Sequence, residues 1–247
     1  MTDSLLIETS GRVTTFTLNR PDKMNAIDSG MARALQDGFA AFDADDDQRV
    51  AILTGAGEKA FTSGADLGDF PELWRCMPGM GVTTMKPVIC AIDGLCIGGG
   101  IVLAALCDLC VASSRAKFVY PEGKVGVTGG YIATLAARLP HKMAMEIMLL
   151  GRAVSADRAF QMGLVNQVTE PGAHLDAARA MAEEMAEMAP LVLQTLKQAV
   201  VSEMLTPAPA ERMGRALRDL DRVEMSEDRQ EGLAAFREKR KADFRGR

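Results

Sequence analysis

The sequence predicts an α/β fold in which short strands alternate with helices. Two observations carry this prediction. Apolar and β-branched runs of four to six residues end at turn residues, for example at Thr54-Gly55 and at Asp93-Gly94. Amphipathic or apolar stretches of helical length separate several of these runs. A sheet built from strand–helix–strand crossovers is the expected architecture.

The first half of the chain supplies the strands of this prediction. Residues 13–18 alternate and are rich in β-formers, and residues 19–23 interrupt them. Asp28 or Ser29 can then cap a helix whose apolar face holds Met31, Leu35, Phe39 and Phe42. The further strands are expected at residues 50–53, 87–92, 109–112 and 117–119, with a helix after the glycines 98–100.

The second half of the chain is predicted to be helical. The β signal fades after about residue 128, and Pro140, Gly151, Gly163 and Pro190 separate the helical patterns. The expected helices are residues 132–139, 142–150, 155–162, 175–188, 191–205 and 210–223, and a last one that Ser226 caps and that runs to about residue 244.

Size and charge exclude several classes of protein. The 247 residues suffice for one large domain or for one domain with an appendage. A net charge of −5 gives no general attraction to nucleic acid or to anionic membranes. A membrane-spanning helix needs about 20 consecutive apolar residues, and no apolar run in the sequence is that long. Because the first residues also lack a signal-peptide pattern, we expect a cytoplasmic protein with neither nucleic acid nor membrane as partner.

The cysteines do not point to a metal or a disulfide framework. There are five, an odd number, and most lie in apolar runs, which favours buried free thiols. Cys107 and Cys110 form a CxxC pair, but no second pair of ligands accompanies them. The acidic residues 43–47 lack the spacing of a calcium loop. We therefore expect no metal site.

Three consecutive glycines, Gly98, Gly99 and Gly100, are the most informative motif. Glycine lets a ligand approach the backbone closely, and the helix expected after them presents unpaired N–H donors. Residues 60–67 have the same small-residue character and offer a second donor. The glycines lack the Lys-Ser/Thr of a phosphate-binding loop, and no acidic residue at dinucleotide-fold spacing follows. Ser63 lacks a plausible catalytic triad. An oxyanion hole is the favoured interpretation.

Six segments, in order along nearly the whole chain, resemble the crotonase (enoyl-CoA hydratase/isomerase) superfamily. Residues 60–66 and 94–100 match the two signatures that form its oxyanion hole, and Pro121-Glu122 matches a step whose glutamate faces the substrate. The other matching segments are residues 19–26, 163–166 and 228–241.

The resemblance implies an architecture beyond the α/β class. It implies a ClpP/crotonase-like spiral of ββα units with a C-terminal helical region. Residues 1–189 would form the spiral core with the acyl-CoA site, and residues 190–247 a helical region for trimerisation. A homotrimer or a dimer of trimers is therefore expected.

The resemblance also implies a substrate and its site. The substrate would be an acyl-CoA thioester, and no separate cofactor is expected because CoA is part of that substrate. The backbone N–H groups of Ala65 and Gly99 would form the oxyanion hole. Residues expected to contact the substrate or its CoA are Lys23, Asn25, Ala26, Ser63, Gly64, Asp66, Leu67, Gly98, Val102, Thr128, Tyr131 and Lys239. Taken by itself, Asp66 is interpreted as a helix cap.

The catalytic chemistry depends on Val102 and Glu122. Hydratases that the chain resembles carry a glutamate where it has Val102, which leaves Glu122 as the expected acid/base. A buried carboxyl group should have a raised pKa and can take and return a proton. We expect 3,2-enoyl-CoA isomerisation. The alternatives are an enoyl-CoA hydratase with a non-standard acid, to which Asp69 or Glu72 is open as a contributor, and a non-catalytic CoA-ester binder.

Overall fold

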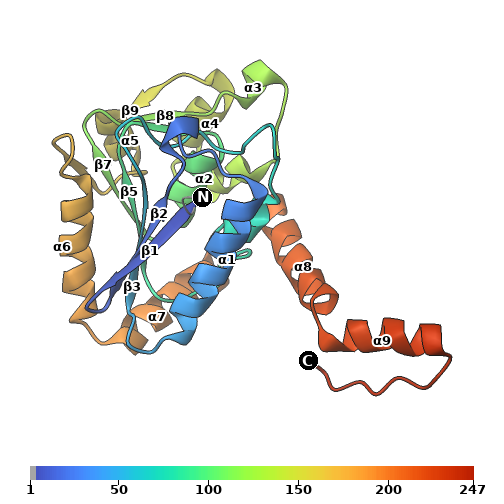
Figure 1. Cartoon of the computed structure of the whole chain (residues 1–247). Helices are drawn as coiled ribbons and strands as arrows, with labels where there is room; N and C mark the ends of the chain where they lie inside the picture. Colours follow the sequence, from blue (N-terminus) through green and yellow to red (C-terminus); the bar gives the residue numbers. More distant parts are fainter. Residues whose placement is uncertain (1–3) are drawn as a thin grey trace.

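The computed structural model describes residues 4–247, and two sheets form its body (Figure 1). The larger sheet has the strand order β1-β2-β3-β5-β7-β10. All its neighbours pair in parallel except β1 and β2, which form an antiparallel hairpin. Its strands are β1 Leu5–Ser10, β2 Val13–Leu18, β3 Val50–Gly55, β5 Val88–Ile92, β7 Leu109–Ser113 and β10 Gln167–Thr169.

The smaller sheet explains why the fold is a spiral. It has the order β4-β6-β8-β9, with strands β4 Ala60–Thr62, β6 Leu95–Ile97, β8 Lys117–Val119 and β9 Val154–Ser155. Each of β3, β5 and β7 in the larger sheet is followed in sequence by a strand of the smaller one. The chain therefore passes from the larger sheet to the smaller one three times, as expected for a crotonase-type spiral of ββα units.

The helices largely follow the expected order. The α-helices of the described residues are α1 Ser29–Ala44, α2 Gly99–Leu106, α3 Glu122–Val125, α4 His141–Leu150, α5 Ala156–Met162, α6 His174–Ala186, α7 Pro190–Gln198, α8 Pro209–Glu224 and α9 Glu227–Glu238. Short 3-10 helices are η1 Pro21–Lys23, η2 Leu73–Cys76 and η3 Tyr131–Ala137, and a π-helix, η4 Ala199–Met204, continues α7.

The predicted capped helix is confirmed. Asp28 precedes α1, and its side chain accepts a hydrogen bond from the Met31 amide at 2.8 Å. The apolar face of α1 lies in the main core, where Phe39 stacks on Phe16 with ring centroids 4.1 Å apart and Phe42 meets both rings edge-on. This core fills the space between α1, the two sheets and α2.

Two helical predictions need correction. Residues 131–137 form a 3-10 helix in place of an α-helix. The last helix ends at Glu238, short of the predicted residue 244. Carboxylates on α9 accept amide hydrogen bonds from the residues that follow it: Glu231 from Asp243 at 2.8 Å and Asp228 from Arg245 at 2.6 Å. These bonds fold the tail back along α9.

The C-terminal helices extend from the body. In Figure 1, α8 leaves the body and α9 lies beyond it, away from the sheets. Arg75 holds the end of α8 to η2 through two hydrogen bonds to Asp221, at 2.8 and 2.7 Å. The boundary expected at residue 189 stays a prediction. Within residues 4–247, no helix is long and apolar enough to cross a membrane, and no group of side chains is arranged to hold a metal ion.

Candidate active site

The two small-residue segments of the sequence meet at the start of α2. Gly64 has a φ of +87°, and a Cβ there would lie 3.0 Å from the Ile97 carbonyl oxygen and 3.2 Å from the Gly99 nitrogen. Gly98 turns the chain into α2 with a φ of +55° and a ψ of −115°, a conformation open chiefly to glycine. The backbones of residues 64 and 97–99 are therefore in direct contact, which requires glycine at position 64.

This contact leaves two amide donors without partners. The flanking bonds are made: Ile27 donates to the Gly64 oxygen at 2.8 Å, and the Asp66 amide donates to the Ile27 oxygen at 2.8 Å. Within the described residues, the N–H groups of Ala65 and Gly99 donate to no backbone oxygen outside the regular elements. Two free donors on adjacent segments are the components of an oxyanion hole.

A hydrogen-bond network fixes the first of these segments. Asn25 is buried, and its side-chain amide donates to the carbonyl oxygens of Ala56 and Ala60 at 2.9 and 2.8 Å. Arg20 donates to Asp66 at 2.9 Å and to the Ala26 oxygen at 2.7 Å. The bonds from the Gly68 amide and from Arg20 lower the pKa of Asp66. These side chains therefore hold the turn, and Asp66 is engaged as a turn residue.

Glu122 supplies the carboxyl group at this site. It is the first residue of the four-residue helix α3, and its Oε1 atom lies 2.9 Å from the Cβ position of Gly98. Its Oε2 atom is buried and has no hydrogen-bond partner. Burial raises the pKa of Glu122 from 4.5 to about 7. An unpartnered carboxyl with such a pKa, next to the Gly98–Gly99 turn, suits proton transfer.

Position 102 supplies no second carboxyl group. Val102 is 1% exposed and belongs to the main core. The two acids that the sequence left open are engaged elsewhere. Asp69 accepts a hydrogen bond from the Ser29 hydroxyl at 2.7 Å, and Glu72 pairs with Arg75 at 2.8 Å. Both carboxylates therefore have hydrogen-bond partners in this arrangement, whereas Glu122 Oε2 has none.

The other residues predicted to contact the substrate differ in their exposure to solvent. Leu67 is 78% exposed, and the exposed Lys23 offers its carbonyl oxygen to the Ser63 hydroxyl at 3.4 Å. Tyr131 is half-buried against the main core. Lys239 follows α9 and is remote from α3 within one chain, as Figure 1 shows for the two helices. One chain therefore does not bring Lys239 to Glu122.

Sequence reasoning missed two side chains that lie beside the Gly99 backbone. Leu73 and Met77 both lie 3.8 Å from the Cβ position of Gly99. Both come from residues 68–86, a segment without strand or helix periodicity. Its side chains are placed by long-range packing, so no local pattern singles them out.

Comparison with known proteins decides the family. The family model "Enoyl-CoA hydratase/isomerase" matches residues 8–78 and 79–247. The chain belongs to the enoyl-CoA hydratase/isomerase family. It is an enzyme of the crotonase fold, and both expectations from the sequence are confirmed.

Relatives across the enoyl-CoA hydratase/isomerase family cover the whole chain. An (E)-benzylidenesuccinyl-CoA hydratase of Thauera aromatica is 39% identical over 97% of this chain and 98% of its own. A carnitinyl-CoA dehydratase of Salmonella arizonae is 36% identical over the full length of both. The solved carnitinyl-CoA dehydratase of Mycobacterium avium is 34% identical, with a TM-score of 0.77 over 99% of each chain. These relatives are named for hydration or dehydration, and an isomerase pattern at the site is not confirmed.

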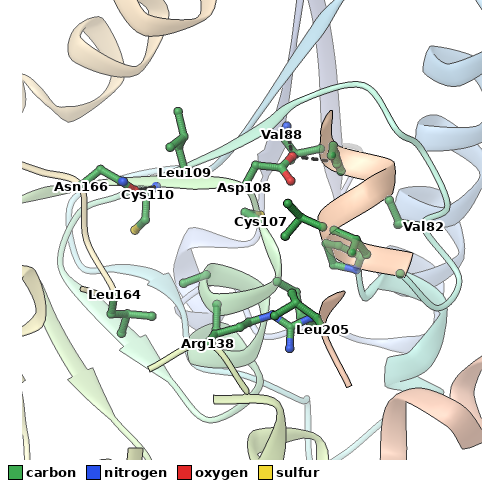
Figure 2. A pocket seen from close by; sticks show the side chains of 18 of the residues that line it. Val82, Val88, Cys107, Asp108, Leu109, Cys110, Arg138, Leu164, Asn166 and Leu205 are labelled. Atoms are coloured by element: carbon green, nitrogen blue, oxygen red, sulfur yellow. Dashed lines mark hydrogen bonds and ion pairs between the residues drawn. The ribbon is translucent and has the colours of Figure 1, made fainter. Parts of the chain in front are cut away.

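The lining of the cavity in Figure 2 includes neither Glu122 nor the Gly98–Gly99 turn. The cavity measures about 270 Å³ and lies at the other end of α2, next to Leu106 and Cys107. Its charged groups are paired: Asp108 accepts from the Val88 amide at 2.8 Å and from Lys197 at 2.7 Å, and Arg138 pairs with Glu211. Ala104 is the first α2 residue of the lining and follows Gly99 by five residues, so cavity and turn are about 7.5 Å apart along the helix.

Proposed function

We propose that the protein isomerises a 3-enoyl-CoA thioester to the 2-enoyl-CoA, with Glu122 as the only proton carrier. The observation that supports this is a single unpartnered carboxyl group beside the Gly98–Gly99 turn, while position 102 holds a buried valine. A reaction that only moves a proton needs one such group. Addition of water, in contrast, requires activation of the water as well as protonation of carbon.

The proposed reaction starts at the thioester carbonyl. Its oxygen accepts hydrogen bonds from the Ala65 and Gly99 amides, which stabilise the negative charge that develops there. The Glu122 carboxylate removes a proton from C2, and the electron pair spreads over the dienolate. Glu122 then returns the proton at C4, so that the double bond moves from C3–C4 to C2–C3. Because the carboxyl group starts and ends deprotonated, the cycle needs no other acid.

The protonation balance of Glu122 supports the same assignment. With a pKa of about 7, the carboxylate is substantially populated at neutral pH, and the acid it becomes still gives up its proton readily. Leu73 and Met77 place apolar surface next to the Gly99 amide. An apolar lining keeps water from the dienolate and strengthens the hydrogen bonds to its oxygen.

Hydration or dehydration of an acyl-CoA is the second candidate, and the names of the relatives favour it. The Thauera aromatica relative is a hydratase and the Salmonella arizonae relative a dehydratase. In this chain Glu122 would then have to activate water and protonate carbon in turn. The acids Asp69 and Glu72 are held by Ser29 and Arg75, so a reorientation would be needed to recruit them.

Parallel assays separate the candidates. The isomerisation of 3-hexenoyl-CoA and the hydration of crotonyl-CoA are measured with the same preparation. Faster turnover of 3-hexenoyl-CoA is expected. If only crotonyl-CoA is turned over, isomerisation is refuted and the protein is a hydratase. Tight binding of a CoA ester without turnover of either substrate would leave a non-catalytic binding protein.

We also propose that the protein assembles as a homotrimer or a dimer of trimers. Several large apolar side chains of α7, α8 and α9 are exposed, such as Leu191, Leu220, Val223 and Phe236. A surface of this kind on projecting helices is suited to a second copy of the chain. Assembly would also give Lys239 a route to the CoA of a neighbouring subunit. Light scattering during size-exclusion chromatography measures the mass, and a monomer would refute the proposal.

A further inference from the structure

The loop that carries Glu122 is fastened by a side-chain hydrogen bond. The Tyr120 hydroxyl lies 3.1 Å from the Thr128 hydroxyl, and the Gly130 amide donates to the same Thr128 oxygen at 3.1 Å. Tyr120 ends the segment that leaves β8, and Thr128 lies six residues after Glu122. The bond therefore closes residues 120–128 into a ring with Glu122 inside it.

The loop has little packing of its own. Residues 123–129 are exposed, and no atom of the described residues lies within 4 Å of the Cβ positions of Gly123 and Gly126. Other hydrogen bonds of the loop do not reach the core. The Gly126 amide donates to the Glu122 carbonyl oxygen at 2.8 Å within the loop, and the Lys124 ammonium donates to the Gly151 carbonyl oxygen at 2.7 Å. Tyr120 alone among the clasping side chains is buried in the main core, where it is 7% exposed.

The burial and the pKa of the Glu122 carboxyl group depend on the position of this loop. Burial raises the pKa of Glu122, and no charged side chain contributes to the shift. The nearby ammonium group of Lys124 is bound to Gly151. Burial, and to a smaller extent the charge of Glu122, also raise the pKa of Tyr120, so its hydroxyl stays neutral beside that of Thr128. A loosened loop would admit water to the carboxyl group.

We propose that Tyr120 is a positioning residue for proton transfer. Through its hydrogen bond to Thr128, it holds residues 122–128 on the core and keeps the Glu122 carboxyl group buried beside Gly98. Tyr120 does not itself touch the reacting atoms. The inference rests on the proposed role of Glu122 as the base. It also gives Thr128, which the sequence placed among the substrate contacts, a structural role. We call the hydrogen bond between Tyr120 and Thr128 the clasp.

Removal of either hydroxyl tests the clasp in assays. Tyr120→Phe keeps the ring in the core, and Thr128→Val changes an exposed side chain. Each variant should lower kcat about tenfold, the effect of about one lost hydrogen bond, with KM nearly unchanged. The double variant should be no slower than either single one. Thr169→Val, in the remote strand β10, is the matched control and should leave kcat unchanged. A raised KM in Thr128→Val with additive effects would assign Thr128 to the substrate and overturn the clasp.

A titration without substrate separates this inference from the proposed function. Nuclear magnetic resonance of carbon-labelled glutamate follows the carboxyl group of Glu122 with pH. The titration midpoint should fall from about 7 in the wild-type protein toward the ordinary value of 4.5 in Tyr120→Phe and in Thr128→Val. An unchanged midpoint in both variants would overturn the inference. Absence of turnover by the wild-type protein would refute the proposed function and leave this titration interpretable.

Discussion

The Glu122 carboxyl group occupies the space that a side chain at Gly98 would need. Its Oε1 atom lies 2.9 Å from the Cβ position of residue 98, closer than two such atoms approach. The same glycine adopts a φ of +55°, which lets the next amide, that of Gly99, start α2 unpaired. The proposed base and the proposed oxyanion donor are thus placed by one backbone turn.

Gly98→Ala should therefore separate these two groups. The flexible end of Glu122 can swing away from the new methyl group at little cost, but it then leaves the position that proton transfer needs. A displacement of about 1 Å costs about a hundredfold in rate. The variant should lose at least that much in kcat and, because of its positive φ, about 1–2 kcal/mol of stability. Gly123→Ala, whose Cβ meets no described atom within 4 Å, is the control and should stay active and stable.

Glu122→Gln should abolish isomerisation while the protein still binds acyl-CoA. The amide has the size of the carboxyl group but cannot accept the proton, and general-base catalysis contributes about 10²–10⁴-fold. Asp69→Asn is the comparison, because Asp69 contacts Ser29 and should not take part in catalysis. Assays of both variants with 3-hexenoyl-CoA check this. Full activity of Glu122→Gln would move the base elsewhere, and loss of activity in Asp69→Asn would restore Asp69 as an acid.

The raised pKa of Glu122 predicts two opposite dependences on pH. Activity should rise through a pKa of about 7, because only the carboxylate removes a proton. Stability should move the other way. Because the folded protein binds the proton more tightly than the unfolded chain, the contribution of the protonated form is complete below pH 4.5 and is lost as pH rises through about 7.

Denaturant titrations of wild type and Glu122→Gln check the second dependence. Between pH 4.5 and 7, the free energy of unfolding of the wild type should fall relative to that of Glu122→Gln, which has no proton to lose. Parallel curves for the two proteins over this range would show that burial does not raise the pKa of Glu122.

The sequence could predict what local patterns encode. Residues 13–18 form β2 with the predicted bounds, and the apolar face of α1 packs as its 3.6-residue period indicates. The strands β4, β6 and β9 are two or three residues long, too short to show an alternating pattern. Their place in the second sheet comes from pairing between distant segments.

At the candidate site, family motifs mark the glycines and Glu122 in the sequence, and their catalytic roles stay predictions. The structural role of Asn25 could not be predicted, because its side chain donates hydrogen bonds to carbonyl oxygens 31 and 35 residues away. The same holds for Thr128, whose hydroxyl partner Tyr120 is set by the path of the loop rather than by a motif. Long-range hydrogen bonds decide whether a polar side chain faces the substrate or the scaffold.

Asp221→Asn should weaken the attachment of α8 to the body. Asp221 binds the guanidinium of Arg75 through two hydrogen bonds, and the Arg75 side chain is only 6% exposed. The variant leaves this cation with Glu72 and Gln36, and the loss of its charged hydrogen-bond partner on α8 should lower the free energy of unfolding by about 2 kcal/mol. Asp219→Asn, whose exposed carboxylate pairs with the adjacent Arg218, is the control. Denaturant unfolding measures both, and equal stabilities would show that Arg75 does not anchor α8.

Val102→Glu should add the carboxyl group that the second candidate reaction needs. If a glutamate at this position of α2 reaches the substrate, it could activate water while Glu122 protonates carbon, and such a group contributes about 10²–10⁴-fold. The ratio of crotonyl-CoA hydration to 3-hexenoyl-CoA isomerisation should therefore rise at least tenfold. Val102→Gln has the same size without the charge and should show no rise. Both variants bury a polar group at a position that is 1% exposed, so both should lose about 1–3 kcal/mol of stability. A folded Val102→Glu protein without any gain in hydration would show that the pocket cannot hold the attacking water.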